Sequence, residues 1–167
     1  MEYFEVIEKR QSIRKYQSRP IEPEKIQAIL KAANQAPSAG NFQAYEINVT
    51  TKQPMRDALA RTTWDMAWIA KAPLLIIFCT HAKRCQYPGA DSCAMQDASI
   101  ATTQAMLAVT AQGLGACWVG AFDPTRVAEV IGAPEGVRPM SILAIGYTDE
   151  NPERTTRRPL SELVHEL

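Results

Sequence analysis

The stretch DSCAMQDASIATTQAMLAVTAQ, residues 91–112, decides the fold class of this chain. It contains no glycine or proline and many alanines, a composition that favours one uninterrupted α-helix. Gly113 follows directly, and glycine is a typical residue at the end of a helix. The small side chains allow other elements to pack closely on this helix. Apolar, strand-like segments lie on both sides of it in the chain, so the sequence predicts a helix packed on a sheet.

Working outward, strands and helices alternate along the chain. The alternating or continuous apolar patterns of β-strands occur at residues 45–51, 73–79, 117–120 and 140–147. Helices are expected at residues 3–9, from Pro23 to the residue before Pro37, at 53–61 and at 124–131 after an Asp123 cap. A Trp-rich segment is expected at 64–71, a loop at 83–89 and an extended tail from Asp149. The length suits a single domain over residues 1–167, and strands that interleave with helices predict the α+β or α/β class.

Length and charge exclude several classes of protein. The chain has 167 residues, which suits one domain, and its 18 Lys and Arg balance its 18 Asp and Glu. Balanced charge argues against nucleic-acid binding, which requires a basic surface. The longest apolar run, residues 73–79, is too short to cross a membrane. Charged Glu2, Glu5 and Glu8 follow Met1, so no signal peptide is visible and a cytoplasmic location is expected.

The cysteines do not predict a metal site. Cys79, Cys85, Cys93 and Cys117 contain no CxxC spacing and match no zinc or iron–sulfur pattern, even with His81 nearby. Cys79 and Cys117 lie in apolar segments, where cysteine acts as a small hydrophobic residue. Disulfides are not expected in a cytoplasmic enzyme.

Two polar segments are the candidate binding elements. RQSIRKY, residues 10–16, combines cations with a hydroxyl group, and guanidinium groups bind phosphate as bidentate forks. PSAGNFQ, residues 37–43, has small residues that let the backbone approach a flat ring and amides that can bind the ring's edge. A phosphorylated heteroaromatic cofactor would suit both. The alternatives are a solvated helix end for the first segment and an ordinary helix-ending turn for the second.

These segments resemble motifs of the nitroreductase family of FMN-dependent flavoproteins. The family's R-x-S-x-R-x-[YF] and P-S-x-x-N-x-Q patterns match Arg10, Ser12, Arg14, Tyr16, Pro37, Ser38, Asn41 and Gln43. GLGACWVGAF at residues 113–122 and RRPLSELV at 157–164 are similar to two further family elements. The motifs occur in the family's order and cover nearly the whole chain.

The resemblance implies a fold and a first group of cofactor contacts. It implies an α+β fold with a central mixed, mainly antiparallel sheet flanked by helices, working as an obligate homodimer with flavin sites at the interface. Carried over residue by residue, Arg10, Ser12 and Arg14 would contact the phosphate, ribityl chain and pyrimidine edge of FMN, and Gln11 could donate as well. Arg14 near the pyrimidine would stabilise negative charge on the reduced flavin.

The resemblance also implies contacts from three later segments. Pro37, Ser38, Ala39 and Asn41 would reach the flavin of the other subunit, with Ala39 standing where a second serine is common. The backbone of Val119, Gly120 and Ala121 would pass the central ring, with the Gly120 N–H as donor to N5. Arg157 aligns with a phosphate-binding arginine slightly better than Arg158, and Thr155 replaces a frequent lysine. The glycines of residues 113–120 do not have the spacing of a dinucleotide-binding fingerprint.

The implied activity is that of an FMN-dependent oxidoreductase. Hydride would pass from NADH or NADPH through flavin N5 to a flat electron-poor acceptor, such as a nitroaromatic or a quinone, by ping-pong kinetics. No Ser–His–Asp pattern is present, so no catalytic side chain is assigned. The alternatives are reductive dehalogenation, enoate reduction or flavin breakdown on the same fold, or a non-enzymatic flavin-binding redox module.

Trp64, Trp68 and Tyr45 could line a pocket or fill the core, and Asp97 is assigned no role.

Overall fold

One four-stranded sheet organises the molecule. In the computed structural model, which describes residues 1–167, the strands follow the order β1, β2, β4, β3. Their bounds are Tyr45–Thr50 for β1, Leu74–His81 for β2, Gly115–Val119 for β3 and Val137–Gly146 for β4. Every neighbouring pair is antiparallel, so the expectation of a mixed sheet was wrong for the named strands. Parallel pairing is limited to an isolated bridge between Ser12 and Ala116.

Five α-helices complete the fold close to their expected positions. They are α1 (Tyr3–Lys9), α2 (Pro23–Asn34), α3 (Gln53–Ala60), α4 (Ala90–Ala111) and α5 (Pro124–Ile131). Short 3₁₀ turns occur at Ala39–Asn41, Ala67–Lys71, Ala82–Arg84 and Leu160–Glu162. The expected Asp123 cap is confirmed, because its carboxylate accepts the Thr125 and Arg126 N–H groups at the start of α5.

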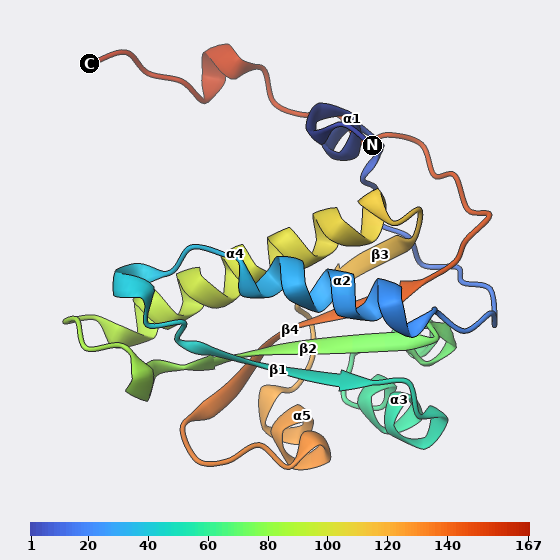
Figure 1. Ribbon diagram of the computed structural model, residues 1–167, viewed down its shortest axis with the longest axis horizontal. Helices are drawn as coiled ribbons and strands as arrows, with labels where there is room; N and C mark the ends of the chain where they lie inside the picture. The colour runs from blue at the N-terminus through green and yellow to red at the C-terminus, as the bar shows by residue number, and fades with distance from the viewer.

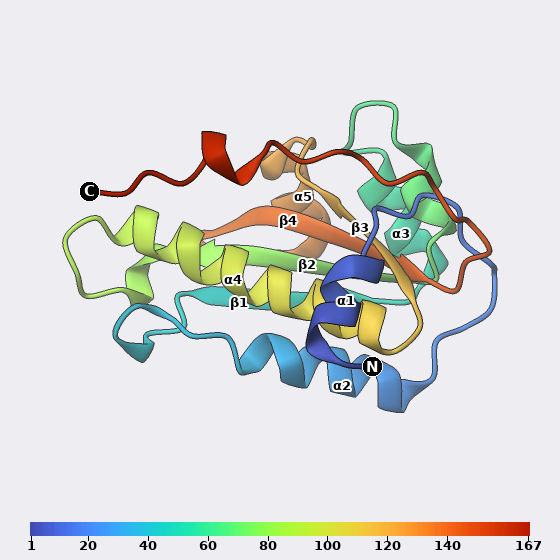
Figure 2. The ribbon, with the colours of Figure 1, turned by 90° about the horizontal axis from the view of Figure 1, so that it is seen from above.

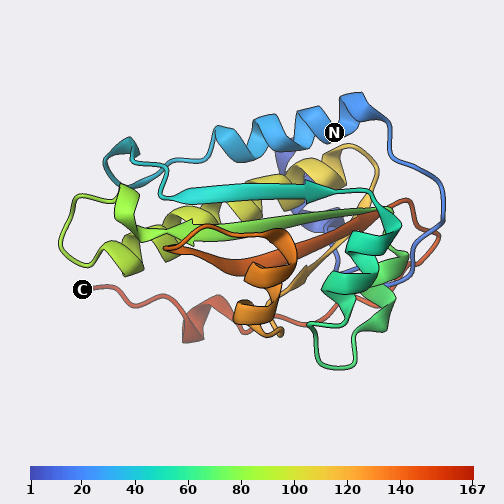
Figure 3. The same ribbon diagram turned by 90° about the horizontal axis from the view of Figure 1, so that it is seen from below.

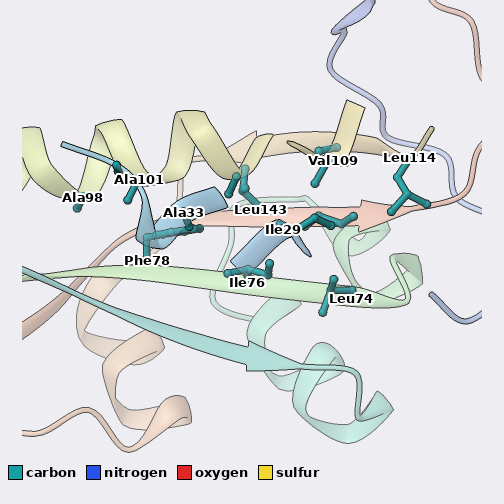
Figure 4. Packing of buried hydrophobic residues seen from close by; sticks show 14 of the residues in the cluster. Ile29, Ala33, Leu74, Ile76, Phe78, Ala98, Ala101, Val109, Leu114 and Leu143 are labelled. Carbon is teal, nitrogen blue, oxygen red and sulfur yellow. The ribbon is translucent and has the colours of Figure 1, made fainter. Parts of the chain in front are cut away.

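Helices cover both faces of the sheet (Figure 1). The long helix α4 and the neighbouring α2 pack on one face, where Ile29, Val109 and Leu143 belong to the larger buried cluster (Figure 4). Helices α3 and α5 lie against the other face (Figure 3), over a second cluster that includes Leu59 and Ile142. The alanines on the buried side of α4 let this helix approach the sheet closely.

Two strands begin earlier than their sequences indicate. Strand β4 starts at Val137 rather than Met140, although Pro139 lacks the N–H needed for a regular ladder. A register shift opposite Phe78 and Cys79 accommodates this proline. Strand β3 starts at Gly115 rather than Cys117, and Gly115 pairs with Gly146. Pairing with β2 therefore extends β4, and pairing with β4 extends β3, beyond their apolar runs.

The chain ends in an extended tail, as expected. Residues 153–167 are all exposed, and Figure 2 shows this segment running across the molecule above the sheet. The Arg154 guanidinium donates to the Glu8 carbonyl at 2.6 Å and so connects the tail to α1. The molecule contains no helix with the length and apolar character required to span a bilayer.

Candidate functional site

The segment after α1 lies alongside β3. The Ile13 N–H donates to the Ala116 carbonyl at 2.9 Å, next to the parallel bridge between Ser12 and Ala116. The Ile13 side chain is buried over Gly115, where an added Cβ would lie 2.8 Å from the Ile13 Cγ1 atom. Because side chains alternate along an extended segment, burial of Ile13 turns its neighbours Ser12 and Arg14 to the opposite side.

Three of the residues predicted to bind a cofactor gather around Cys117 of β3. The bridge between Ser12 and Ala116 places Ser12 and its neighbours Arg10 and Arg14 alongside the part of β3 that contains Cys117. Burial raises the pKa of the Cys117 thiol, and the Glu150 carboxylate adds to this effect, while Arg14, Ser12 and Arg10 act in the opposite direction. Neither guanidinium forms an ion pair with a carboxylate of this chain. This cluster consequently has positive charge available for an anion.

Backbone contacts fix the end of the same segment. The Glu150 carboxylate accepts the N–H groups of Arg14 and Lys15 at 2.7 and 3.0 Å, and the first of these bonds is the largest cause of its lowered pKa. The Tyr16 hydroxyl donates to the Ala144 carbonyl, and burial raises the pKa of this phenol. Gln11 lies apart from the Cys117 cluster, in a groove of about 210 Å³ that Glu150 also lines.

The connection after β3 exposes its backbone between two anchored residues. Val119 and Phe122 are buried, whereas Gly120 and Ala121 are exposed. Phe122 bridges to Thr63, which holds this connection against the segment after α3. A Cβ added at Gly120 would meet only the Trp118 Nε1 atom, at 3.9 Å. Nothing within the chain requires glycine here, and the open backbone could receive a flat ring.

The loop at residues 37–43 is held by a buried carboxylate. Asp97 of α4 is 1% exposed and accepts the Ala39 N–H at 2.9 Å and the Ala44 N–H at 3.2 Å. Ser38 does not face outward freely, because its hydroxyl accepts the Gln43 N–H at 3.1 Å. Pro37 and Asn41 are exposed, and Ala39 is half-buried. Asp97 therefore holds this loop in one conformation at the end of α2.

The same loop contains unusual backbone angles. Gly40, Asn41 and Gln43 have φ angles of 54°, 58° and 49°, in the left-handed region. Glycine and asparagine adopt this region readily, whereas glutamine does so at a cost. Strained backbone of this kind is concentrated at binding sites, provided that surrounding contacts maintain it. The two hydrogen bonds to Asp97 are such contacts.

The two polar segments lie at opposite ends of the sheet within one chain. Ser12 bridges to Ala116, whose partner on β4 is Ile145. The loop at 37–43 leads into Tyr45, which lies beside Thr80 and, one strand further, Arg138 of β4. Ile145 and Arg138 are seven residues apart on β4. At about 3.3 Å per residue, the two polar segments are therefore separated by roughly 20–25 Å along the sheet. One protomer does not bring them together.

The C-terminal arginines form no hydrogen bond or ion pair with Arg10, Ser12, Arg14 or Cys117. Arg157 and Arg158 are exposed, and the Arg157 guanidinium donates to the Thr155 and Thr156 carbonyls and the Thr155 hydroxyl of its own segment. The tail contacts α1 through Arg154, close in sequence to both arginines. Within one chain, Arg157 and Arg158 do not complete the site.

The aromatic candidates separate into core and surface residues. Tyr45 is 8% exposed and belongs to the core between the sheet and α2. Trp68 packs near Tyr16, with ring centroids 6.4 Å apart, at the margin of the other cluster. Trp64 is 66% exposed and follows Thr63, which bridges to Phe122. Only Trp64 therefore has a surface free for a ligand near the Gly120 backbone.

Sequence reasoning missed two carboxylates that position the candidate segments. Asp97 had a detectable signal, because helical spacing places it on the same face as Ala94, Ala98 and Ala101, which are buried. A charge on that face needs partners. Glu150 had no such signal, because it follows the last strand in an exposed polar segment and its partners are 136 and 135 residues away.

Comparison with known proteins gives a consistent result. The model of the nitroreductase family matches residues 7–87 and 49–147 of this chain. A protein of Methanothermobacter thermautotrophicus, provisionally named NADH dehydrogenase/NAD(P)H nitroreductase, is 34% identical over 156 residues, covering 91% of this chain and 80% of the relative. The NADPH-flavin oxidoreductase of Vibrio harveyi is 29% identical, covering 97% of this chain and 72% of that protein.

Solved structures share the fold over almost the whole chain. The NADPH:FMN oxidoreductase of Vibrio harveyi in complex with NAD⁺ superposes with a TM-score of 0.92 at 27% identity, covering 98% of this chain and 76% of that structure. Nitroreductase A of Vibrio parahaemolyticus gives a TM-score of 0.93 at 27% identity, covering 99% of this chain and 76% of that structure.

Proposed function

Because this chain belongs to the nitroreductase family of oxidoreductases, we propose that it is an FMN-dependent enzyme that oxidises NADH or NADPH. The proposed acceptor is a flat, electron-poor molecule such as a nitroaromatic or a quinone, reduced by ping-pong kinetics. The names of two relatives, an NADPH-flavin oxidoreductase and an FMN reductase that uses NAD(P)H, support the cofactor and the donor. The proposal places the enzyme in the cytoplasm, as the sequence predicts.

The observation that carries this proposal is the cluster of Arg10, Ser12 and Arg14, which the Ser12–Ala116 bridge and the Ile13–Ala116 hydrogen bond place beside Cys117 on β3. Its two guanidinium groups have no carboxylate partner in the chain, so they are available to a phosphate. The exposed Gly120 backbone follows directly after β3, four residues beyond Ala116, or roughly 13 Å away along the chain. A cofactor with a phosphate at one end and a flat ring at the other suits this arrangement.

Bound FMN would supply two-electron transfer between a nicotinamide and the acceptor. The protein's residues would bind and orient it. Arg10 would bind the phosphate, Ser12 would donate to the ribityl chain, and Arg14 would place positive charge at the pyrimidine edge. The Gly120 N–H would direct a backbone hydrogen bond to the central ring without any titrating side chain. Thus the proposed site needs no dedicated acid or base.

We also propose that the active unit is a homodimer. The loop containing Pro37, Ser38, Ala39 and Asn41 lies at the far end of the sheet from the Cys117 cluster, so it could complete a flavin site only on a second chain. Arg157 and Arg158, in the exposed tail, could do the same. Apolar side chains with no cover in one chain support association: Tyr3, Phe4 and Ile7 on α1, and Leu160, Leu163 and Val164 in the tail.

Identification of the bound cofactor and steady-state kinetics test this function together. The purified protein should be yellow and release FMN on acid treatment, and it should oxidise NADH or NADPH with a nitroaromatic or quinone acceptor. Activity restricted to halogenated aromatics, enoates or free flavin would instead support the alternatives of dehalogenation, enoate reduction or flavin breakdown. Flavin binding without NAD(P)H oxidation would identify a redox module, and absence of flavin binding would contradict the whole proposal.

A further inference from the structure

Two cysteines from different elements share one small apolar cluster at the start of α4. Cys85 ends the 3₁₀ turn Ala82–Arg84 and is buried, and Cys93 lies in the first turn of α4 and is half-buried. Both pack with Ala44 and Ala94 in a cluster separate from the two cores. Their packing in this one cluster brings the two side chains together. In agreement with this, the neighbouring Cys85 thiol raises the pKa of the Cys93 thiol.

The other two cysteines have no such partner. Cys79 belongs to the core under α3 and α5, where burial raises the pKa of its thiol to about 12. Cys117 is buried on β3, beside Ser12. The structure therefore separates the four cysteines into one adjacent pair and two isolated, buried thiols.

The chain between the paired cysteines is free to adjust. Residues 86–89 are all exposed, and Gly89 has a left-handed φ of 80° with open space where a Cβ would stand. A disulfide needs its two Cβ atoms about 3.5–4.5 Å apart. A short, exposed, glycine-containing segment can supply the small movement that bond formation requires without disturbing the strands.

We propose that Cys85 and Cys93 are a dithiol that forms a reversible intramolecular disulfide. The oxidant is a low-molecular-weight disulfide such as oxidised glutathione. The more accessible Cys93, as thiolate, attacks the oxidant, forming a mixed disulfide and releasing one thiol. The Cys85 thiolate then attacks the Cys93 sulfur and releases the second thiol. Two protein thiols lose two electrons and two protons, and the oxidant's S–S bond gains them. In a reducing compartment such a bond is transient and serves redox sensing.

The disulfide would act on the loop at residues 37–43. Tyr87 lies between the two cysteines, and its ring stacks edge-on against Phe42 with centroids 5.3 Å apart. The Tyr87 hydroxyl also lies 3.0 Å from the position of a Cβ added at Gly40. Closing the bond would restrict the segment carrying Tyr87 and, through Phe42, the loop that Asp97 holds. This inference stands independently of the proposed flavin chemistry.

The test is a thiol map after equilibration of the full chain with oxidised and reduced glutathione. Combined cleavage by trypsin after Arg84 and by Asp-N before Asp91 places Cys85 in residues 85–90 and Cys93 in residues 91–96. After thiols are blocked by alkylation, the oxidised protein should yield these two peptides cross-linked. Cys79 and Cys117 should remain alkylated, and reduction should restore both peptides. A persistent mixed disulfide on Cys93, or full alkylation of all thiols, would overturn the proposal.

Matched variants separate this pair from general oxidation. Cys93→Ser and Cys85→Ala should abolish the cross-link, and Cys85→Ala should accumulate the mixed disulfide on Cys93. Cys79→Ala should leave the cross-link unchanged. Circular dichroism identifies any variant that does not fold, and Cys93 is half-buried, so its variant tests the pairing even if Cys85→Ala fails. Hydrogen exchange in residues 86–89 should slow on oxidation of the wild type, and unchanged exchange would contradict the restriction of this segment.

Discussion

At the scale of single residues, Asp97 connects the long helix to the most strained loop. Its carboxylate is almost fully buried and its two oxygens accept one backbone N–H each, from Ala39 and Ala44. A carboxyl group at this depth is tolerated because both of its oxygens have donors. The contribution of Asp97 to the stability of the protein therefore depends both on the charge of the carboxylate and on the positions of its two oxygens.

We expect Asp97→Asn to destabilise the protein by about 2 kcal/mol, in the range of hydrogen bonds to charged groups. An amide can accept from only one of the two N–H groups, and its own NH₂ faces the other. Urea unfolding measures the loss, and hydrogen exchange should accelerate at the Ala39 and Ala44 amides. Gln96→Ala, on the exposed side of the same helix, is the control and should change stability by less than about 0.5 kcal/mol. Equal effects of the two substitutions would contradict the role of Asp97.

A second residue-scale prediction concerns the proposed phosphate contact. Arg10→Ala should weaken FMN binding about tenfold to hundredfold, because charge-assisted hydrogen bonds to phosphate are lost. Arg138→Ala is the control, because Arg138 is an exposed guanidinium at the other end of β4. Titration of the apoprotein with FMN gives both dissociation constants. If Arg10→Ala binds FMN as tightly as the control, Arg10 is an ordinary solvated charge.

At the scale of elements, β3 begins with a glycine that packing requires and is followed by one that the packing of the chain does not require. Gly115 is covered by Ile13, whereas Gly120 faces open space. Strand β3 therefore has one end in which packing excludes a side chain and another end that is free for a ligand. The two glycines allow the structural and the functional roles of this strand to be separated.

Alanine at each glycine should produce opposite effects. Gly115→Ala places a Cβ 2.8 Å from the Ile13 Cγ1 atom and should cost about 1–3 kcal/mol of stability. Gly120→Ala should leave the stability nearly unchanged but weaken FMN binding, because its methyl group occupies the surface offered to the ring. Thermal unfolding and FMN titration of both variants make the comparison. Tight FMN binding by Gly120→Ala would remove this backbone from the proposed site.

Another element-scale contact joins α2 to the end of β4. The Tyr147 hydroxyl donates to Glu22 at 2.6 Å, and this bond is the largest cause that lowers the pKa of Glu22 to about 2. Arg19 also pairs with Glu22 at 2.7 Å. Glu22 loses its proton more readily in the folded state than in the unfolded state. Its contribution to the free energy of unfolding is therefore complete above a pH of about 4.5 and is lost as the pH falls toward 2.

Tyr147→Phe should therefore make stability less sensitive to acid. Without the hydroxyl, the pKa of Glu22 in the folded protein moves toward its ordinary value. The difference in melting temperature between wild type and variant should be largest above pH 5 and should shrink as the pH falls toward 2. Thermal scans at pH 6, 4 and 2.5 measure it. A difference that is constant across these pH values would show that Tyr147 acts through packing alone.

At the scale of the whole molecule, the candidate segments are distributed over both ends of one sheet. The Cys117 cluster and the Gly120 backbone lie along β3, and the Asp97-held loop lies beyond the start of β1 (Figure 1). The exposed tail adds two arginines, of which Arg157 donates only to its own segment. This distribution is expected if each complete site is built from two chains.

We expect association and cofactor binding to be linked. FMN that binds only the dimer should shift the monomer–dimer equilibrium toward the dimer by mass action. Light scattering or sedimentation across a dilution series, with and without excess FMN, measures this shift. A monomer that retains FMN and oxidises NAD(P)H would contradict the interface site and would remove Ser38 and Asn41 as cross-subunit contacts.

The sequence by itself determined the elements and the family. Alanine-rich, glycine-free residues 91–112 predicted α4, the apolar run at 73–79 predicted β2, and Asp123 predicted the start of α5, because these signals depend on local propensity and capping. The motifs at residues 10–16 and 37–43 identified the family because they occur in order along the chain, and the family comparison confirmed this.

Only the tertiary structure decided how these elements meet. Pairing with β4 extended β3 back to Gly115, and the register shift allowed Pro139 within a strand, although neither residue favours a strand locally. Burial turned Asp97 into the anchor of a loop 58 residues away in sequence. Such contacts depend on which surfaces face each other after packing, and this information is absent from local patterns. The same reason explains why Cys85 and Cys93 become a pair only in the folded chain.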